Sequence, residues 1–220
     1  MSELGQGTLA PTHSAGIDRE PPRGWKLVPL GDLARPSTER IEPAQCPDAP
    51  YLSLEHIEAH TTRILGHGVG ADVSSTKSVF HAGDVLYGKL RPYLNKVCVP
   101  SFDGICSTDI LVFPRSPVVD SRVLMWFLNG REVVEHANHQ SKGVQLPRVS
   151  FQALAPLLFP LPPLAEQRRI VEKVEALLAR VDAAHDRLAV VPGILKRFRP
   201  GGAGGGMFGK ADGRLEKRSW

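Results

Sequence analysis

A pair of prolines followed directly by a heptad pattern constrains this chain more than any other feature of its sequence. Pro162–Pro163 cannot lie inside a helix, but proline is tolerated where a helix begins, because the first N–H groups have no partner there. Glu166 then falls in the first turn, beside the positive end of the helix dipole. The sequence therefore predicts a helix that begins near Leu164 and runs to about Val191, just before Pro192.

Apolar residues recur along this helix at alternating spacings of four and three, the 3.5-residue period with which one helix packs along another. They are Ile170, Val174, Leu177, Val181, Ala184 and Leu188. At about 1.5 Å per residue the helix is on the order of 40 Å long, more than a small domain needs. We expect a partner helix to cover this stripe; an amphipathic helix packed on its own domain is the alternative.

Composition restricts the class of protein. The 220 residues, 42% of them hydrophobic, suffice for one good core, so we expect one globular domain with an appended helix. A net charge of +4 permits nucleic-acid binding through a local patch. Three cysteines without CxxC spacing disfavour a disulfide framework or zinc site and favour a reducing cytoplasm. Neither a membrane span nor a secretion signal is indicated, so we expect a cytoplasmic location.

The body of the chain mixes short strands and helices. Strands are predicted at Tyr51–Ile57, Asp84–Tyr87, Asn95–Val99, Ile105–Phe113 and Pro156–Leu161. Asp120 or Ser121 can cap a helix to about His136, with Gly130 as its weak point, and Ser150 can cap a short second helix. The predicted fold is therefore α+β: a globular domain of mixed strands and helices, followed by a long C-terminal coiled-coil-type helix.

One loop combines the side chains with which proteins contact DNA. It carries Lys89, Arg91, Tyr93, Asn95 and Lys96. The cations suit phosphates, the ring can stack on a base, and the amide can read a base edge. A merely solvated loop with a packed tyrosine is the alternative interpretation.

A second loop offers Lys142, Gln145 and Arg148 around Gly143, where the absence of a side chain lets the backbone approach a ligand closely. We predict that Lys142 and Arg148 set the register on phosphates, whereas Gln145 can pair with adenine in the major groove. These two loops are the candidate DNA-binding residues of the chain.

A stand-alone enzyme is disfavoured because the motifs of the enzyme classes considered are missing, although nuclease folds with other motifs stay open. No lysine has Asp or Glu two residues before it, so the metal-dependent nuclease element D/E-x-K is absent. Neither Pro-Pro pair fits the tetrad of an amino-methyltransferase, and GHGVG at Gly66–Gly70 lacks a strand-turn-helix frame for a cofactor. The acidic and histidine residues of Glu132–His139 are better explained by a polar helix face than by a metal. We predict a binding protein without catalytic residues, metal or cofactor.

Four segments in order carry a family resemblance. They are GWKLVPLGDL (Gly24–Leu33), YLSLEHI (Tyr51–Ile57), GDVLYGKLRP (Gly83–Pro92) and the stretch Ser141–Asp182. Together they resemble the DNA-specificity subunit of type I restriction-modification systems over about Gly24–Arg199, most specifically in PLPPLAEQRRIVEKVEALL. The resemblance implies a target-recognition domain that reads one part of a bipartite DNA site, followed by a conserved spacer helix. In the family this unit occurs twice per chain, its two helices pair antiparallel, and the subunit docks onto methyltransferase subunits and a translocating nuclease subunit.

The resemblance implies the recognition domain and the spacer helix, and composition indicates a disordered segment at each end. Residues 1–23 form a disordered leader, 24–163 the recognition domain, 164–199 the spacer helix with a short following helix, and 200–220 a disordered tail. The tail has five glycines among the six residues from Gly201 to Gly206. Read one nucleotide later, a choice of synonymous codons from Gly201 spells a segment similar to the family's, so we hypothesise a frameshift that replaced the second recognition domain.

For such a half-subunit we consider two alternatives. Two copies can pair through the heptad stripe as a homodimer and read a symmetric bipartite site. The alternative is a non-functional remnant. A third interpretation, from a different class, is a coiled-coil interaction protein without DNA specificity, which would show no preference among DNA sequences.

Overall fold

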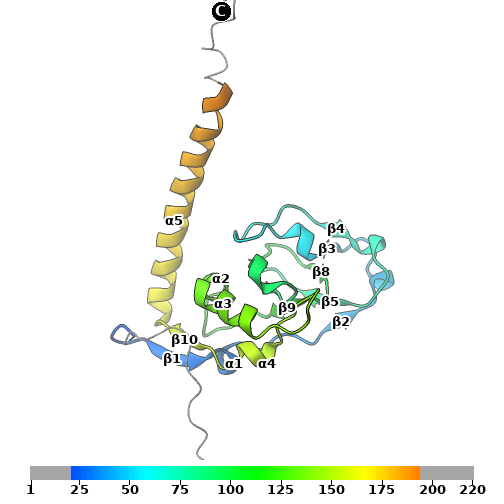
Figure 1. Cartoon of the computed structure of the whole chain (residues 1–220), viewed down its shortest axis with the longest axis horizontal. Coiled ribbons are helices and arrows are strands. Elements are labelled where there is room, and N and C mark those ends of the chain that lie inside the picture. The colour runs from blue at the N-terminus through cyan, green and yellow to red at the C-terminus, as the bar shows by residue number, and fades with distance from the viewer. Residues whose placement is uncertain (1–20, 194–220) are drawn as a thin grey trace, which may run out of the picture. The chain divides into compact units, whose positions relative to one another are not determined.

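The computed structural model describes residues 21–193 (Figure 1). The chain divides into two compact units, and the boundary lies between Lys173 and Val174, inside the last helix. The predicted leader up to residue 20, the short helix expected after residue 193 and the glycine-rich tail lie outside the described residues. The frameshift hypothesis concerns that tail and lies outside them too.

Short strands of the first unit form three small sheets (Figure 1). In the two-stranded sheet, β1 (Lys26–Pro29) pairs antiparallel with β10 (Leu158–Leu161). The five-stranded sheet has the order β2 (Arg40–Ile41), β5 (Lys77–Phe80), β8 (Gly104–Cys106), β3 (Pro50–Leu52) and β4 (Gly68–Val69). The three-stranded antiparallel sheet has the order β7 (Val97–Cys98), β6 (Val85–Gly88) and β9 (Ile110–Phe113). With the helices described below, these sheets confirm the α+β class.

The three-stranded sheet is covered by a hydrophobic core on each face. Along β6, Val85 and Tyr87 pack in one buried cluster and Leu86 in the other. Neighbouring residues of β9 divide in the same way, with Phe113 in the first cluster and Val112 in the second. Successive side chains of a strand point to opposite faces, so both faces of this sheet are buried. This explains why its strands read as nearly continuous apolar runs.

The prediction of one strand over Ile105–Phe113 was wrong. The segment forms two strands, β8 and β9, in two different sheets. Between them, Ser107 makes a turn: its Oγ accepts from Asp109 N at 3.2 Å and its carbonyl accepts from Ile110 N at 2.9 Å. The polar residues Ser107–Asp109 separate the two apolar segments, and Ser and Asp are common turn residues, so the sequence does carry a signal for this break.

The prediction of one helix from Asp120 to His136 was also wrong in its extent. There are two helices, α2 (Ser121–Asn129) and α3 (Arg131–His139), separated by Gly130 with φ −65° and ψ 144°. Helix interiors are unfavourable for glycine, and here it provides the break. The predicted cap at Asp120 is confirmed, since its side chain accepts from Arg122 N at 2.8 Å.

The predictions for the remaining short elements were confirmed only in part. Ser150 caps α4 (Phe151–Leu154) as predicted, accepting from Ala153 N at 3.3 Å. The strand expected over Tyr51–Ile57 ends at Leu52, and a 3₁₀ turn, η2 (Leu54–His56), follows it. The strand expected over Asn95–Val99 is limited to the two residues of β7. A further short helix, α1 (Leu30–Leu33), follows β1 directly.

The long helix α5 (Leu164–Ala189) begins where the prolines predict and ends two residues before the expected Val191. Its start belongs to the first unit and is bonded to the rest of that unit through Glu166, whose Oε2 accepts from Trp25 Nε1 at 3.0 Å. The next residue, Gln167, is only 1% exposed and uses both ends of its amide. It accepts from Asp120 N at 2.7 Å and donates to the carbonyls of Val118 and Pro162 at 3.0 Å each. Among the described residues, no helix is long and apolar enough to cross a membrane.

Candidate nucleic-acid interface

The two basic loops found in the sequence lie side by side in the structure. We call them the 89–96 loop (Lys89–Lys96) and the 141–148 loop (Ser141–Arg148). Backbone bonds join them: Arg91 N donates to Pro147 O at 2.7 Å, and Val149 N donates to Lys89 O at 3.0 Å. A further isolated β-bridge pairs Leu90 with Arg148. Segments about fifty residues apart in sequence therefore form one continuous backbone platform.

The 141–148 loop is closed at its base by reciprocal bonds between Lys142 and Arg148. Each backbone N–H donates to the other residue's carbonyl at 2.9 Å. At the tip, Gly143 has a φ of +104°, a conformation that favours glycine. Val144 is fully exposed, with a fractional exposure of 102%, and Gln145 is exposed beside it. The closed base thus presents a tip of exposed side chains.

The 89–96 loop is built around a 3₁₀ turn, η4 (Pro92–Leu94), with left-handed residues on both sides. Arg91 has φ 51° and Asn95 has φ 46°. The third non-glycine residue with positive φ in the described chain, His60, donates its N–H to the carbonyls of Leu94 and Asn95 at 3.2 Å each. Such conformations persist only where surrounding contacts impose them, and they cluster at functional sites.

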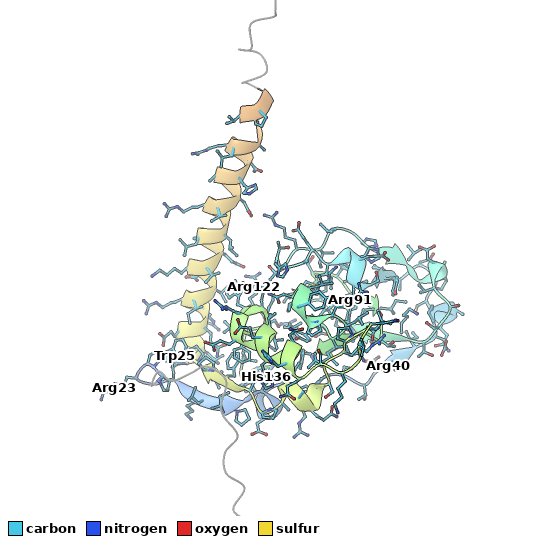
Figure 2. All side chains as sticks on the ribbon, in the orientation of Figure 1. Arg23, Trp25, Arg40, Arg91, Arg122 and His136 are labelled. Carbon is cyan, nitrogen blue, oxygen red and sulfur yellow. The ribbon has the colours of Figure 1, made fainter. Side chains whose placement is uncertain are left out.

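Two of the predicted contact residues in this loop instead form hydrogen bonds to other parts of the domain and so stabilise the loop. Asn95 Nδ2 donates to the carbonyl of Asn129 at 3.0 Å, and Lys96 Nζ donates to the carbonyl of Leu54 at 2.5 Å. Arg91, labelled in Figure 2, and Tyr93 are instead exposed. Within residues 21–193, the side chains of Lys89, Arg91 and Lys142 make no hydrogen bond or ion pair. These three cations are available to an anionic ligand.

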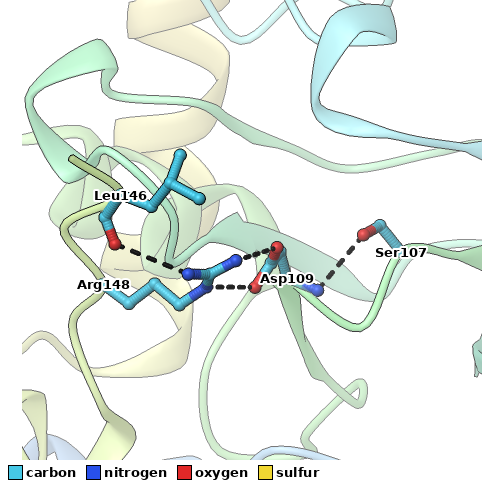
Figure 3. Close-up of polar contacts among 4 residues, drawn as sticks. All are labelled: Ser107, Asp109, Leu146 and Arg148. Atoms are coloured by element: carbon cyan, nitrogen blue, oxygen red, sulfur yellow. Dashed lines mark hydrogen bonds and ion pairs between the residues drawn. The ribbon is translucent and has the colours of Figure 1, made fainter. Parts of the chain in front are cut away.

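Arg148 has a partner that the sequence did not indicate. Its Nε donates to Asp109 Oδ1 at 2.8 Å and its Nη2 donates to Asp109 Oδ2 at 3.1 Å, while Nη1 lies 3.5 Å from the carbonyl of Leu146 (Figure 3). The bonds from Arg148 hold the pKa of the Asp109 carboxyl below its ordinary value, and the charge of Lys89 acts in the same direction. Bonding to Asp109 in turn raises the pKa of Arg148.

Two of the residues considered for metal binding, Glu135 and His136, have other partners, and two of the cysteines are buried. His136 Nε2 lies 2.8 Å from the carbonyl of Ala153 (Figure 2 labels His136), and Glu135 pairs with Arg131 at 2.7 Å. Burial raises the pKa of the Cys98 and Cys106 thiols to about 12, so both stay protonated near neutral pH. Buried protonated thiols are poor nucleophiles.

Along α5 the heptad stripe becomes more exposed toward the C-terminus. Ile170 and Val174 are half-buried. Leu177, Val181 and Leu188 are 51%, 58% and 67% exposed. Exposed large apolar side chains in a regular stripe are typical of a surface that another helix covers.

Sequence reasoning missed Asp109, Trp25 and Gln167. Asp109 contacts Arg148 across 39 positions, and Trp25 contacts Glu166 across 141. No local spacing records such pairs. Gln167 is polar at a helix position where an exposed residue is the ordinary expectation. The side-by-side placement of the two loops was likewise not predicted, although each loop was identified.

Comparison with known proteins shows which family the chain belongs to. Residues 22–192 match the model described as "Type I restriction modification DNA specificity domain". The type I restriction enzyme EcoDI specificity subunit of Escherichia coli is 33% identical over 164 residues, 73% of this chain and 36% of the relative. The EcoKI specificity subunit of Escherichia coli strain K12 is 53% identical over 51 residues, 23% of this chain and 11% of the relative.

Solved structures with a similar fold come from the same kind of system. The HsdS subunit from Thermoanaerobacter tengcongensis superposes with a TM-score of 0.67 at 31% identity, over 78% of this chain and 46% of that one. A chain from a type I R-M system, described for its complex assembly and conformational transition, gives 0.65 at 29% identity over 84% and 52%. The chain thus spans about half of these solved chains and a smaller part of the curated relatives.

Proposed function

Because this chain belongs to the family of type I restriction modification DNA specificity domains, we propose that it binds double-stranded DNA sequence-specifically and reads one part of a bipartite site. Residues 24–163 form the recognition domain and α5 the spacer helix. The chain itself is not an enzyme and needs no cofactor. Methyltransferase subunits, and a restriction subunit in the full complex, supply the chemistry in the cytoplasm.

The two joined loops are the observation that supports this proposal most directly. They bring together cations for phosphates, with Arg91 and Lys142 exposed and Lys89 half-buried, and exposed groups for bases, at Tyr93 and Gln145. Phosphate contacts position a protein on the duplex and base contacts specify the sequence, so a recognition surface needs both kinds. The backbone bonds between the loops hold both sets in one rigid arrangement.

Binding of a duplex by charge-removing variants tests the surface. We expect Lys142→Ala to weaken binding of a fluorescently labelled mixed-sequence duplex and to reduce the slope of log K against log salt by about 0.9, the loss of one phosphate contact. Lys26→Ala is the matched control, an exposed lysine on β1 outside both loops. Equal effects of the two variants would reject the loops as the interface.

A methylation map tests specificity in cells. The chain is co-expressed with its neighbouring methyltransferase subunit in a host that lacks other modification genes, with Lys142→Ala and Lys26→Ala strains in parallel. A new methylated motif, lost or weakened only in Lys142→Ala, supports the proposal. DNA binding without sequence preference, together with no motif, would favour a coiled-coil interaction protein instead.

We further propose that α5 pairs with another helix, supplied by a second copy of the chain or by a second specificity unit. The exposure of Leu177, Val181 and Leu188 supports this proposal. Leu177→Glu with Val181→Glu places two charges on the stripe, whereas Ala179→Glu lies about 200° around the helix from Leu177. In sedimentation experiments the double variant should be monomeric, and Ala179→Glu should keep the self-association of the wild type. A monomeric wild type that binds no partner helix would contradict pairing.

A further inference from the structure

The bonds of Arg148 leave part of its guanidinium free and fix the orientation of that part. A guanidinium has five N–H donors in a rigid plane. Two of them bind the two oxygens of Asp109, and a third faces the carbonyl of Leu146 at 3.5 Å (Figure 3). Two donors therefore remain. The Arg148 side chain is 45% exposed, so the remaining donors are accessible to a ligand.

The backbone around Arg148 fixes its position as well. Its N–H and carbonyl both bond to Lys142, and the next residue, Val149, donates to Lys89 O at 3.0 Å. Asp109 is fixed in turn, because its carbonyl accepts from Lys89 N at 2.9 Å and its N–H donates to Ser107 Oγ. The backbone of Lys89 thus bonds both to Asp109 and to Val149, the neighbour of Arg148, and so links the two partners of the ion pair.

Charge decides which ligand such an arginine suits. The ion pair with Asp109 is neutral as a unit, and a carboxylate at 2.8 Å competes with a phosphate for the same cation. Phosphate contacts draw their strength from uncompensated positive charge and the release of counterions. A base edge is neutral and requires aligned donors instead, and arginine bidentate to guanine O6 and N7 is the commonest contact of this kind.

We propose that Asp109 is a positioning residue that holds Arg148 to recognise a guanine edge in the major groove, so that Arg148 is a specificity-determining residue and not a phosphate contact. This inference rests on the proposed function and replaces the prediction from sequence that Arg148 sets phosphate register. Lys142 is paired with Arg148 through the backbone, and its side chain makes no ion pair within residues 21–193. It remains the phosphate contact at the base of the same loop.

Selection from a randomised duplex pool by the full chain tests the inference, with the salt dependence of binding measured for each protein. In the wild-type motif we expect at least one fixed guanine. Arg148→Ala should make that guanine position degenerate, keep the other positions and leave the salt slope unchanged. Asp109→Asn should relax the same position and steepen the salt slope by about 0.9, because the released arginine can then reach a phosphate.

Two further variants separate positioning from other effects. Arg148→Lys keeps the charge but lacks the planar fork, so it should lose the guanine preference as Arg148→Ala does. Glu135→Gln is the matched control: it removes a carboxylate from an exposed arginine pair on α3 and changes net charge as Asp109→Asn does. It should change neither the selected motif nor the salt slope, and circular dichroism should report all variants folded.

The outcomes distinguish this inference from the function on which it rests. If Arg148→Ala reduces the salt slope by about 0.9 and keeps the motif, Arg148 is a phosphate contact and the inference is wrong. If Asp109→Asn lowers only thermal stability, the ion pair is merely structural and the inference is again wrong. A wild type that selects no motif, alone and with its methyltransferase subunit, rejects the proposed function itself.

Discussion

The 89–96 loop and the 141–148 loop carry similar side chains but are stabilised in different ways. In the 89–96 loop, side chains bind other parts of the domain: Asn95 reaches Asn129 and Lys96 reaches Leu54. The 141–148 loop is closed by backbone bonds at its base and by the Arg148–Asp109 ion pair, and its tip is exposed. The difference teaches that polar loop residues of similar type can either bond to the domain, as Asn95, Lys96 and Arg148 do, or stay exposed, as Arg91 and Lys142 do.

The largest loss of stability is expected for substitutions in the 89–96 loop, whose side chains bind other parts of the domain. Asn95→Ala removes the bond to Asn129 and places alanine at φ 46°, so the free energy of unfolding should fall by about 2–3 kcal/mol. Asn95→Gly loses the same bond but accepts the backbone conformation, so it should cost about 1 kcal/mol less. Urea denaturation measures both. Equal losses would show that the left-handed conformation carries no cost.

A smaller loss is expected at the one glycine of the 141–148 loop. Gly143 has a φ of +104°, and a Cβ there would lie 3.1 Å from the carbonyl of Leu146. Gly143→Ala should therefore cost about 1 kcal/mol in the same urea experiment. Gly66→Ala is the control, since a Cβ at Gly66 meets nothing within 4 Å. A Gly143→Ala variant as stable as Gly66→Ala would mean that the loop rearranges freely.

Acidification should weaken the ion pair that anchors the 141–148 loop and leave the bond that anchors the 89–96 loop unchanged. The folded-state pKa of Asp109 is below the ordinary carboxyl value of 3.8, so its stabilising contribution is complete above that value and is lost as pH falls through the folded pKa. An NMR titration of the Arg148 Nε–H signal should show a transition below pH 3.8, absent in Asp109→Asn. The Asn95 side-chain amide signal should show no such transition, because its bond joins neutral groups. A shared transition would contradict separate anchoring.

The smallest effect is expected at the exposed tip. Val144 is 102% exposed, so Val144→Ser should change the free energy of unfolding by less than about 0.5 kcal/mol. Loss of stability beyond that range would indicate that the tip packs against the domain and is not free for a ligand.

Local signals in the sequence determined those elements whose causes are local. The start of α5 at Leu164 follows from two prolines, and the caps at Asp120 and Ser150 follow from their own side chains. Where a tertiary partner decides the outcome, the sequence was less informative. The segment Ile105–Phe113, predicted as one strand, turns at Ser107, and its two halves pair in different sheets. Of the candidate site, both loops were identified, but not their pairing.

The sequence by itself determined the class of the fold, the position of the long helix, the stripe of apolar residues along it and the identity of the two basic loops. Each depends on residues within a few turns or strand lengths of one another, where backbone geometry translates spacing into a shared face. Only the tertiary structure decided which polar side chains bond to the domain and which stay exposed. Asn95 and Arg148 look alike as loop residues in the sequence; their partners, Asn129 and Asp109, lie 34 and 39 positions away, and only chain folding brings them into contact.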